Sequence, residues 1–528
     1  MLQDGGRTEV QMKKSMTKKL TYLVLALLMA IPLQMISCKK GDEPQKPGDT
    51  ETGEDSQTET EVRTDEWGQD VVESNIPEDL NFGGEEKVNF LIIEDESFSR
   101  EWTADQVTDS LSREIFNRNA AVEKQLGVSL RFHKMYPGSI PNEYDRITER
   151  ILKAGNAGLG EFDVVSNSAA YATKPSLIPF YLNFNDPKLA YFNFEKPWWN
   201  EYYRAASETF GKMYFMVGDV NLSVFDRLIA VYFNHNLCRN YGIDPMEVYQ
   251  MVFDREWTYD KLYELTNDIH EDLNNDGAKD YGDLYGLIGL RASEACDGFL
   301  YSFGLRLTET DEQGMHSVIS DPGMLSKMDT AMSMVQKLFY ETKGSLATVG
   351  TPDHVKIFAE KRAVFNIDVL YHYAAMNALM RSLDDIYGVL PVPKYDLEQK
   401  DYYSCVQDMH NVISLMNHST INHAAVSAVL ELLCEKSYEN VRPYYYEKIV
   451  KLRYTNDAVS SRVFDLLLRS TRWDFGDVYT YAVGMPRNRI WRGTFWDRLS
   501  FKTNYNKWVE SLDKKLVDFD MNVLSALQ

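Results

Sequence analysis

Short apolar runs alternate with amphipathic stretches from residue 86 onward. "KVNFLII" (87–93) is rich in branched residues and predicts a buried strand. "DSLSREIFNRNAAVEKQLGVSLRF" (109–132) predicts a helix capped by Gly127 and then a strand from Val128 to Phe132. "NEYDRITERILKAG" (142–155) and "FDVVSN" (162–167) repeat the order of helix and strand. The alternation predicts an α/β fold with a mostly parallel sheet flanked by helices.

The same alternation returns further along the chain. "RLIAVYFNHNLCRNYGI" (227–243) predicts a strand that runs into a helix, and "WTYDKLYELTNDIHE" (257–271) predicts a helix that begins near Thr258. "FAEKRAVFNI" (358–367) and "YGVLPVP" (387–393) each contain a strand, the second ended by prolines. Helices are expected from "NHAAVSAVLELLCEK" (422–436) onward. A chain of 528 residues exceeds the size at which one core keeps growing, so two lobes are expected.

The N-terminal segment has the pattern of an export signal. Lysines precede an apolar stretch from Leu20 to Leu33, and the small Ser37 precedes Cys38. We therefore predict a signal peptide over residues 1–37, with Met12 or Met16 as alternative starts. The ending "MISC" resembles the lipoprotein box of bacteria, in which lipid is attached to the cysteine, here Cys38. An ordinary secretory signal and an uncleaved anchor are the alternatives.

Residues 38–85 are rich in Thr, Glu, Asp, Gly and Pro, which predicts a disordered acidic tether. The formal net charge of the chain is -23, so nucleic acid and anionic lipid surfaces are not expected partners. The remaining cysteines have no zinc or redox spacing, although one disulfide is possible; they are Cys238, Cys296, Cys405 and Cys434.

Several segments together resemble the extracellular solute-binding proteins of carbohydrate-type ABC importers. The resemblance covers about residues 86–528, and "DFGDVY" (474–479) also recurs in the family. Its main carriers, in order, are "IAVYFNHNLCRNYGID", "EWTYDKLYELT", "FAEKRAVFNID" and "YGVLPVPKYD". It implies a periplasmic-binding-protein-like fold of two discontinuous α/β lobes that close on a ligand at a hinge. The first lobe is expected at about 86–230 and 358–388, the second at about 231–357 and 389–528, and the crossings near 227–233 and 388–393.

The resemblance also implies a location and partners. We expect a monomer, anchored through Cys38 on the outer face of the bacterial cytoplasmic membrane, that delivers a sugar or oligosaccharide to ABC permease subunits. A surface glycan-binding or adhesive lipoprotein without a transport partner is the alternative, and a secreted glycoside hydrolase is a further one. No enzyme is expected, because "HEDLN" (270–274) has Asn274 where a zinc-protease helix needs its second histidine, and "GNAGLG" (155–160) lacks the lysine of a phosphate loop.

A sugar site needs flat aromatic rings for the C–H faces of the sugar and fixed polar groups for its hydroxyls. Ligands of open α/β sheets bind beyond the carboxyl ends of strands. That rule selects the polar candidates Ser166, Asn167 and Ser168, then Asp219 and Asn221, and then Asn366 and Asp368. The stacking candidates are Trp198, Trp199, Tyr371 and Trp473, for which packing inside the core is the alternative reading.

The stretch "DLNNDGAKDYGD" (272–283) matches the spacing of an EF-hand calcium loop. The last ligand position holds an aspartate where a glutamate is usual, and Lys279 replaces the apolar residue that normally anchors the loop. The predicted ligands are Asp272, Asn274, Asp276, the carbonyl of Ala278, Asp280 and Asp283. We predict a weak structural Ca²⁺ site, with an Asx-rich surface turn as the alternative.

Overall fold

The computed structural model describes residues 71–104, 106–137, 145–291, 293–311, 314–317, 321–350, 353–375, 385–450 and 459–525. The predicted signal peptide, Cys38 and most of the predicted tether lie outside these residues. All described elements belong to one compact unit, Thr64–Gln528. Within the described ranges, no helix combines the length and the apolar character that a membrane crossing needs.

The end of the predicted tether is ordered. Ile76 is buried in the core, and Leu80 and Phe82 pack against it. The Ser74 hydroxyl donates to Glu435, and the Asn75 amide donates to the carbonyl of Tyr191 at 2.8 Å. The prediction of a disordered tether to residue 85 is therefore wrong at its C-terminal end, because apolar residues recur there every two to four positions.

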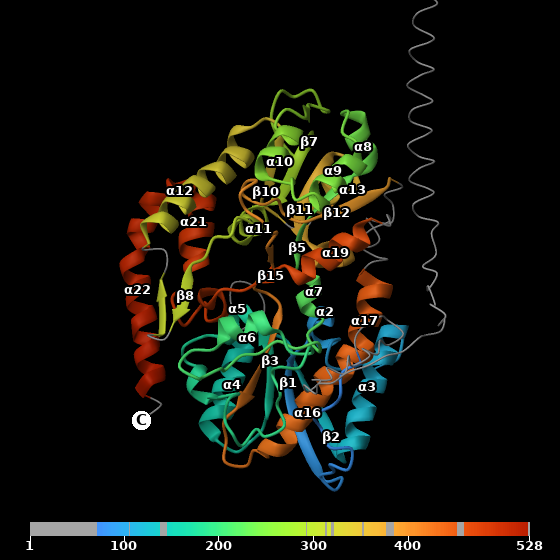
Figure 1. Cartoon of the computed structure of the whole chain (residues 1–528), viewed down its shortest axis with the longest axis vertical. Coiled ribbons are helices and arrows are strands. Elements are labelled where there is room, and N and C mark those ends of the chain that lie inside the picture. The colour runs from blue at the N-terminus through green and yellow to red at the C-terminus, as the bar shows by residue number, and fades with distance from the viewer. Residues whose placement is uncertain are drawn as a thin grey trace, which may run out of the picture. The chain divides into compact units, whose positions relative to one another are not determined.

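The first sheet has the strand order β2-β1-β3-β14-β4. β1 pairs in parallel with β2 and β3, whereas β14 pairs antiparallel with β3 and β4. Figure 1 labels β1, β2 and β3 of this sheet in the lower half of the view, near α3, α4 and α16. The bounds are β1 Glu86–Ile93, β2 Val128–Met135, β3 Val164–Ser168, β4 Tyr181–Leu182, β14 Asn411–Met416, α3 Ser110–Leu126, α4 Asp145–Ala157 and α16 His423–Lys436.

The second sheet has the order β10-β7-β11-β5-β12, and β6 pairs with β7. β7 is parallel to β10 and β11, whereas β5 is antiparallel to β11 and β12. Both sheets are therefore mixed. In each, the strand that follows a crossing from the other lobe, β14 in the first sheet and β5 in the second, is antiparallel to its neighbours. The bounds are β5 Ile229–Asn234, β6 His270–Glu271, β7 Leu284–Leu290, β10 Ser345–Thr348, β11 Ala363–Val369 and β12 Tyr387–Leu390.

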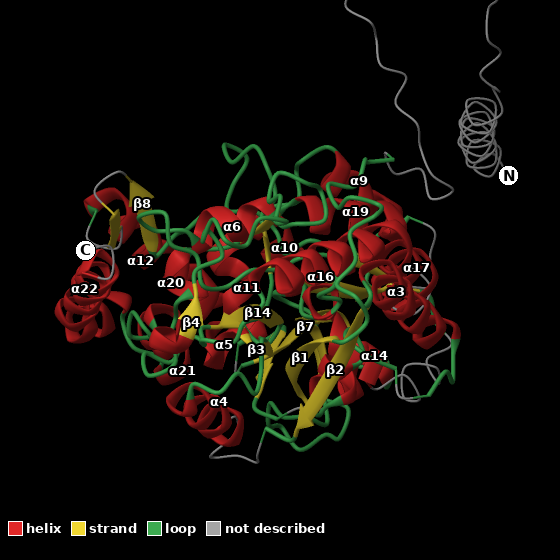
Figure 2. Cartoon of the chain, turned by 90° about the horizontal axis from the view of Figure 1, so that it is seen from below, coloured by secondary structure: helices red, strands yellow, loops and turns green. Residues whose placement is uncertain are grey.

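Helices enclose both sheets, and Figure 2 shows them in red around the yellow strands. The first-lobe helices and short turns are α2 Glu96–Ser99, α5 Ala169–Ala172, η1 Ile178–Phe180, α6 Glu201–Ser207, α7 Ser223–Asp226, η3 Ser437–Val441, α17 Arg442–Tyr444 and η4 Tyr445–Val450. The others are α8 His235–Asn240, α9 Pro245–Phe253, α10 Tyr259–Thr266, α11 Glu294–Ser302, α12 Pro322–Gln336, η2 Lys337–Glu341, α13 Asp353–Ala359, α14 Leu370–Ala375, α19 Ser460–Arg469, α20 Phe475–Val478, η5 Arg487–Arg492, α21 Gly493–Asp497 and α22 Phe501–Ser525. Two small ribbons complete the set, from β8 Thr308–Asp311 with β9 Gly314–Ser317, and from β13 Ser404–Cys405 with β15 Thr471–Arg472.

The sheet pairing corrects the expected lobe boundaries. β11 lies in the second sheet between β7 and β5, so residues 358–388 do not belong to the first lobe. β14 lies in the first sheet, and α16 packs on α3 and β1, so residues 411–450 do not belong to the second lobe. The two crossing segments run side by side, since Leu228 bridges Val406 and the amide of Gln407 donates to the carbonyl of Arg227 at 2.8 Å. The first crossing lies where it was predicted, and the second lies after β13 instead of at 388–393.

Local signals place the elements themselves well. Gly127, which adopts a left-handed backbone with φ 59°, caps the C-terminus of α3, and Asp109, which accepts the amide of Ser112, caps its N-terminus. The predicted runs at 87–93, 128–132, 162–167, 227–243, 358–367 and 387–393 coincide with β1, β2, β3, β5, β11 and β12 to within three residues at the ends that extend past them. The four described thiols are buried and free, so no disulfide forms among them.

Candidate functional site

Trp473 lies in a groove between the two lobes. It follows β15, is partly buried, and lines two adjoining cavities of about 510 and 380 Å³. One wall comes from α6 of the first lobe, and the other comes from the segment after α11. We call this feature the Trp473 groove, which is lined by Tyr202, Ala205, Ala206, Tyr301, Gly304, Leu305, Arg306, Thr308, Glu309, Tyr403, Arg472, Trp473, Asp474 and Phe475.

The groove combines aromatic faces with fixed charges. The guanidinium of Arg472 lies 4.1 Å from the ring centre of Tyr202 and 5.3 Å from that of Tyr403. Arg306 forms an ion pair with Glu309 at 2.6 Å. Flat rings suit the apolar faces of a sugar, and guanidinium groups supply hydrogen-bond donors for its oxygens.

A buried aspartate holds one wall of the groove. Asp474 accepts the backbone amides of Leu307 and Thr308 at 2.8 and 3.0 Å and also the Thr308 hydroxyl. Burial raises the pKa of Asp474, although these three hydrogen bonds and a fourth from the amide of Gly476 oppose the shift. Asp474 therefore fixes β8 against the segment that carries Trp473.

Beside the groove, three aromatic rings meet edge to face. The ring centres of Tyr203 and Trp473 are 5.5 Å apart, and His410 lies 6.1 Å from Tyr203 and 6.3 Å from Trp473. Tyr203 Oη, His410 Nε2 and Trp473 Nε1 are buried and have no hydrogen-bond partner within the described part of the chain. Burial lowers the pKa of His410 to about 4, so this ring is neutral at physiological pH. Buried polar atoms are normally paired, so this cluster has spare capacity for the hydroxyls of a ligand or for water.

A network of buried charges ties the second crossing segment to the C-terminal region. Arg487 pairs with Asp408 at 3.2 Å, with Asp477 at 3.2 Å and with Asp297 at 3.7 Å. Arg492 pairs with Asp408 at 3.1 Å and also with Asp297. Burial alone would raise the pKa of Asp408, but the two guanidinium groups lower it below its usual range. The network holds His410, two residues further on, in its position beside Trp473.

The polar candidates at the end of β3 are buried. Ser166 accepts the indole N–H of Trp102 at 2.7 Å, and the Asn167 side chain accepts the amide of Ser168 at 2.9 Å. The hydroxyl of Ser168 lies 3.4 Å from the carbonyl of Asp408. Among the described residues the Asn167 amide nitrogen has no partner. These contacts are local and structural, and the role of Ser166 and Asn167 in ligand binding stays a prediction.

Trp198 and Trp199 belong to the core. They are 1% and 3% exposed, and both indole N–H groups donate to Glu431, at 2.9 and 2.8 Å. Trp199 also packs against Phe192 and Phe194. Neither ring has a free face for a sugar in this structure, so the packing alternative describes both.

Asp219 and Asn221 stabilise the turn before α7. Asp219 forms an ion pair with Arg442 at 3.3 Å, and burial raises the pKa of Asp219 to about 6 against the effect of this cation. The Asn221 amide donates to Glu101 at 3.3 Å, and its carbonyl accepts the amide of Gly218. Neither residue lines the Trp473 groove.

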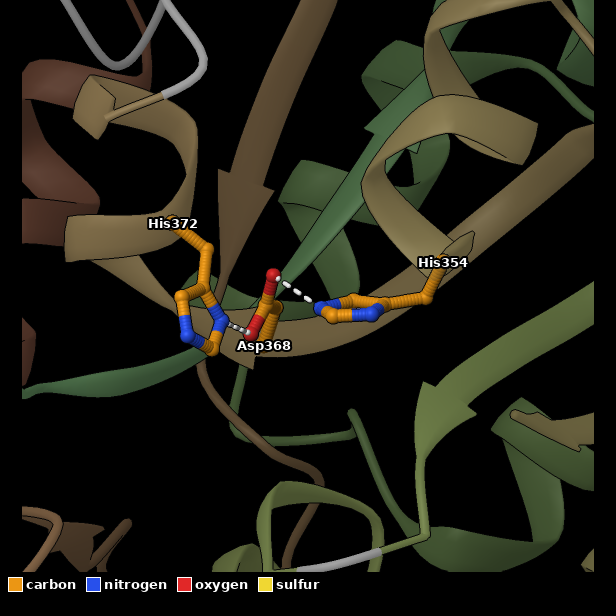
Figure 3. Close-up of side chains that lie close together, drawn as sticks. All are labelled: His354, Asp368 and His372. Carbon is orange, nitrogen blue, oxygen red and sulfur yellow. Dashed lines mark hydrogen bonds and ion pairs between the residues drawn. The ribbon is translucent and has the colours of Figure 1, made fainter. Parts of the chain in front are cut away.

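Asn366, Asp368 and Tyr371 lie at the hinge end of the second sheet. Asn366 is buried in β11 opposite Tyr232, and Tyr371 stacks against the guanidinium of Arg227 at 4.3 Å. Asp368 accepts hydrogen bonds from His354 and His372, as Figure 3 shows. Despite its burial, the two imidazoles hold the pKa of Asp368 below its usual range.

The predicted calcium loop has the local geometry of a tight acidic turn. Asp272 accepts the amide of Gly277 at 2.9 Å, and Asp276 accepts that of Ala278 at 2.7 Å. Gly277 has φ 73°, which a sharp turn requires. Asn274 accepts the amide of Asp276, and Asp280 accepts that of Gly282. The bonds of Asn274, Asp276 and Asp280 are Asx-type contacts to the amide two residues on, whereas Asp272 reaches the amide five residues on. The local geometry fits both of the sequence-based alternatives.

Asp283 has contacts that a simple surface turn does not require. Its side chain is fully buried and accepts from His270 at 3.1 Å, from the amide of Asp280 at 3.2 Å and from Tyr285 at 3.3 Å. Its second oxygen and one oxygen of Asp272 are buried without a hydrogen-bond partner among the described atoms. Lys279 anchors the loop by donating to the carbonyl of Thr342 at 2.8 Å, in place of the usual apolar side chain.

Sequence reasoning found Trp473 but missed its neighbours. Tyr202 and Tyr203 lie on α6, Arg306 precedes β8, and His410 precedes β14, so none of them follows a parallel strand. The rule about carboxyl strand ends cannot select such residues. The only local signal is a high aromatic content near residues 198–203 and 471–481, which also describes ordinary core packing.

Comparison with solved structures identifies the fold. The sugar-binding protein MalE from Xanthomonas citri has a TM-score of 0.54 and 11% identity, covering 83% of this chain and 99% of that chain. A cyclo/maltodextrin-binding protein complexed with maltotetraose has a TM-score of 0.53 and 12% identity, and the match covers 81% of this chain and 97% of that chain. UgpB from Mycobacterium tuberculosis, in complex with glycerophosphocholine, has a TM-score of 0.51 and 13% identity, covering 82% and 99%.

These similarities establish the class of the fold: the chain has the two-lobed α/β fold of the solute-binding proteins of ABC transporters. The fold expected from the sequence is confirmed. No family model and no curated protein matches the chain, so the identification stops at this class.

Proposed function

We propose that the protein is the extracellular binding component of an ABC importer and captures a sugar or oligosaccharide in the Trp473 groove. The fold supports a binding protein whose lobes close on a ligand. The observation that carries the proposal is the contact of Trp473 with Tyr203 and His410, whose three polar ring atoms are buried and unpaired within the described chain. Aromatic faces with unsatisfied polar groups at the same point are what a sugar requires.

The location follows from the N-terminal sequence. We propose that the chain is exported and that lipid on Cys38 anchors it to the outer face of the cytoplasmic membrane, with residues 39–70 as the acidic tether. The proposal does not include catalysis, because the carboxyl groups of the groove already have partners. Glu309 is paired with Arg306, and the buried Asp474 accepts hydrogen bonds from Leu307 and Thr308. No pair of free carboxyl groups faces the groove among its described lining residues.

A thermal-shift screen tests the ligand class. The full chain is heated with monosaccharides, oligosaccharides, peptides and glycerophosphodiesters, since a compound that binds only the native state raises the melting temperature. We expect stabilisation by one or a few carbohydrates. Stabilisation by a peptide or a phosphodiester with no response to any sugar would contradict the sugar assignment, and one neighbour in this fold is a complex with glycerophosphocholine.

The alternative is a surface glycan-binding lipoprotein without a transport partner. Deletion of the gene separates the two, because an importer component is needed for uptake of the radiolabelled ligand found in the screen. Loss of uptake supports the importer. Undiminished uptake together with lost surface binding supports the adhesive lipoprotein, and sugar release from a polysaccharide panel would indicate a hydrolase.

A further inference from the structure

Three side chains converge at the hinge end of β11. His354 lies in the first turn of α13, Asp368 lies in β11 and His372 lies in α14 (Figure 3). His354 Nε2 lies 2.8 Å from one oxygen of Asp368, and His372 Nδ1 lies 2.7 Å from the other. One nitrogen or oxygen atom from each residue lies within 4.8 Å of the other two. The side chains of His354 and Asp368 are 0% exposed, and that of His372 is 13% exposed.

Two imidazole nitrogens and one carboxylate oxygen form a donor set that zinc and its neighbouring transition metals prefer. The ligand atoms of a tetrahedral zinc site lie about 3.3 Å apart, which is within the 4.8 Å that contains one ligand atom from each of the three residues. To bind a shared ion, the two contacts to Asp368 would need to open by about half an ångström. We propose that His354, Asp368 and His372 bind a divalent transition metal ion, with Zn²⁺ as the best fit. The fourth position is left to water or to a neighbouring oxygen.

The hydrogen bonding of His354 permits this role. In the absence of a metal its Nε2 donates to Asp368, whereas its Nδ1 is buried and has no partner among the described atoms. When a metal ion replaces this hydrogen bond, the proton of the neutral ring can reside on Nδ1, and the Nε2 lone pair then binds the metal.

The surrounding charge favours a cation. Glu294 is fully buried beside Asp368 and His372, and its hydrogen bonds come from neutral groups, the Ser293 hydroxyl at 2.6 Å and the Gln407 amide at 2.5 Å. The salt bridges of the described residues include none to Glu294. Arg227 is the nearby cation, and it stacks on Tyr371 and donates to Gln407 at 3.3 Å. Two buried carboxyl groups thus face one guanidinium, and a divalent ion would balance them.

The cluster is separate from the Trp473 groove. None of its three residues lines that groove, and the proposal therefore does not depend on the ligand assigned above. It lies beside Arg227 and Gln407, which belong to the two crossing segments. A metal here would fasten α13, β11 and α14 together next to the hinge.

Metal titration of the full chain without an affinity tag tests the site. The chain is freed of metal with a chelator and titrated with Zn²⁺ by calorimetry and with Co²⁺ by visible absorption, in excess Ca²⁺ so that the 272–283 loop does not contribute. The wild type and the control H133Q, which alters an exposed histidine elsewhere, should bind one equivalent. H372Q and D368N should bind about tenfold or more weakly.

Circular dichroism monitors folding, and H372Q, at the partly exposed position, keeps the test decisive if D368N fails to fold. Absence of zinc binding and of Co²⁺ bands in the wild type would show that the cluster is only a hydrogen-bonded network. Equal zinc affinity in H372Q and the wild type would place the metal elsewhere and overturn the assignment.

Discussion

Single buried carboxyl groups in the first lobe are held by neutral donors. Glu101 accepts the amide of Ser223 at 2.9 Å and the side-chain amides of Asn221 and Asn411 at 3.3 and 2.7 Å. Glu431 is held in the same way by Trp198 and Trp199. Burial raises the pKa of each to about 7, although the hydrogen bonds oppose the shift.

The pKa of Glu101 makes stability depend on pH. Because the folded pKa lies above the unfolded value, the native state retains this proton longer, and the stabilisation is full below the unfolded pKa and is lost as the pH rises through about 7. As the pH rises from about 5 to about 8, the contribution of Glu101 to the free energy of unfolding should fall by roughly 2 kcal/mol. Urea unfolding across this range should show a flatter pH dependence in E101Q and an unchanged one in E247Q, which alters an exposed glutamate. An equal pH dependence in E101Q and the wild type would show that Glu101 does not titrate in this range.

The sequence alone cannot distinguish the core tryptophans Trp198 and Trp199 from the groove residue Trp473. Trp198 and Trp199 are core residues because Glu431, 233 and 232 positions away, accepts their indole protons. Trp473 is partly exposed, and its indole nitrogen has no hydrogen-bond partner among the described residues. The hydrogen-bond partner of each indole determines whether the tryptophan is a core residue, and for Trp198 and Trp199 this partner, Glu431, is distant in sequence.

At the scale of elements, local patterns are sufficient for most helices and strands. The apolar runs at 87–93, 227–243 and 358–367 became β1, β5 and β11, and the Gly127 cap ended α3 where expected. The lobe boundaries were wrong because strand partners are not local. β11 was expected in the first lobe but pairs with β5 and β7 of the second sheet. β14 was expected in the second lobe but pairs with β3 and β4 of the first sheet.

The 272–283 loop is an element whose metal binding stays a proposal. We propose that it binds Ca²⁺ with a dissociation constant of roughly 0.1 to 1 mM. Asp283 and Asp272 each have one buried oxygen without a described partner, which supports a cation there. Calorimetry should detect Ca²⁺ binding in the wild type and in D268N, which alters an exposed aspartate before the loop, and much weaker binding in D276N. No binding at several millimolar would leave an Asx-rich turn.

At the scale of the whole molecule, two crossing segments and one groove relate the lobes. Leu228 and Val406 join the crossings, and Arg487 and Arg492 fix Asp408 just before β14. The sequence indicated this two-lobed architecture through its resemblance to a family of binding proteins, and the solved structures confirm the fold. The groove could not be located from sequence, because its walls come from α6, β8 and β15, which are distant in the chain.

The central claim is that ligand binds at Trp473 between the lobes, and calorimetric titration of single variants tests it most directly. The sugar found in the thermal screen is titrated into the wild type, W473A and W496A, where Trp496 is exposed on α21 outside the groove. Loss of the stacking face should weaken binding about tenfold or more in W473A and leave W496A unchanged. Wild-type affinity in a folded W473A would contradict the account.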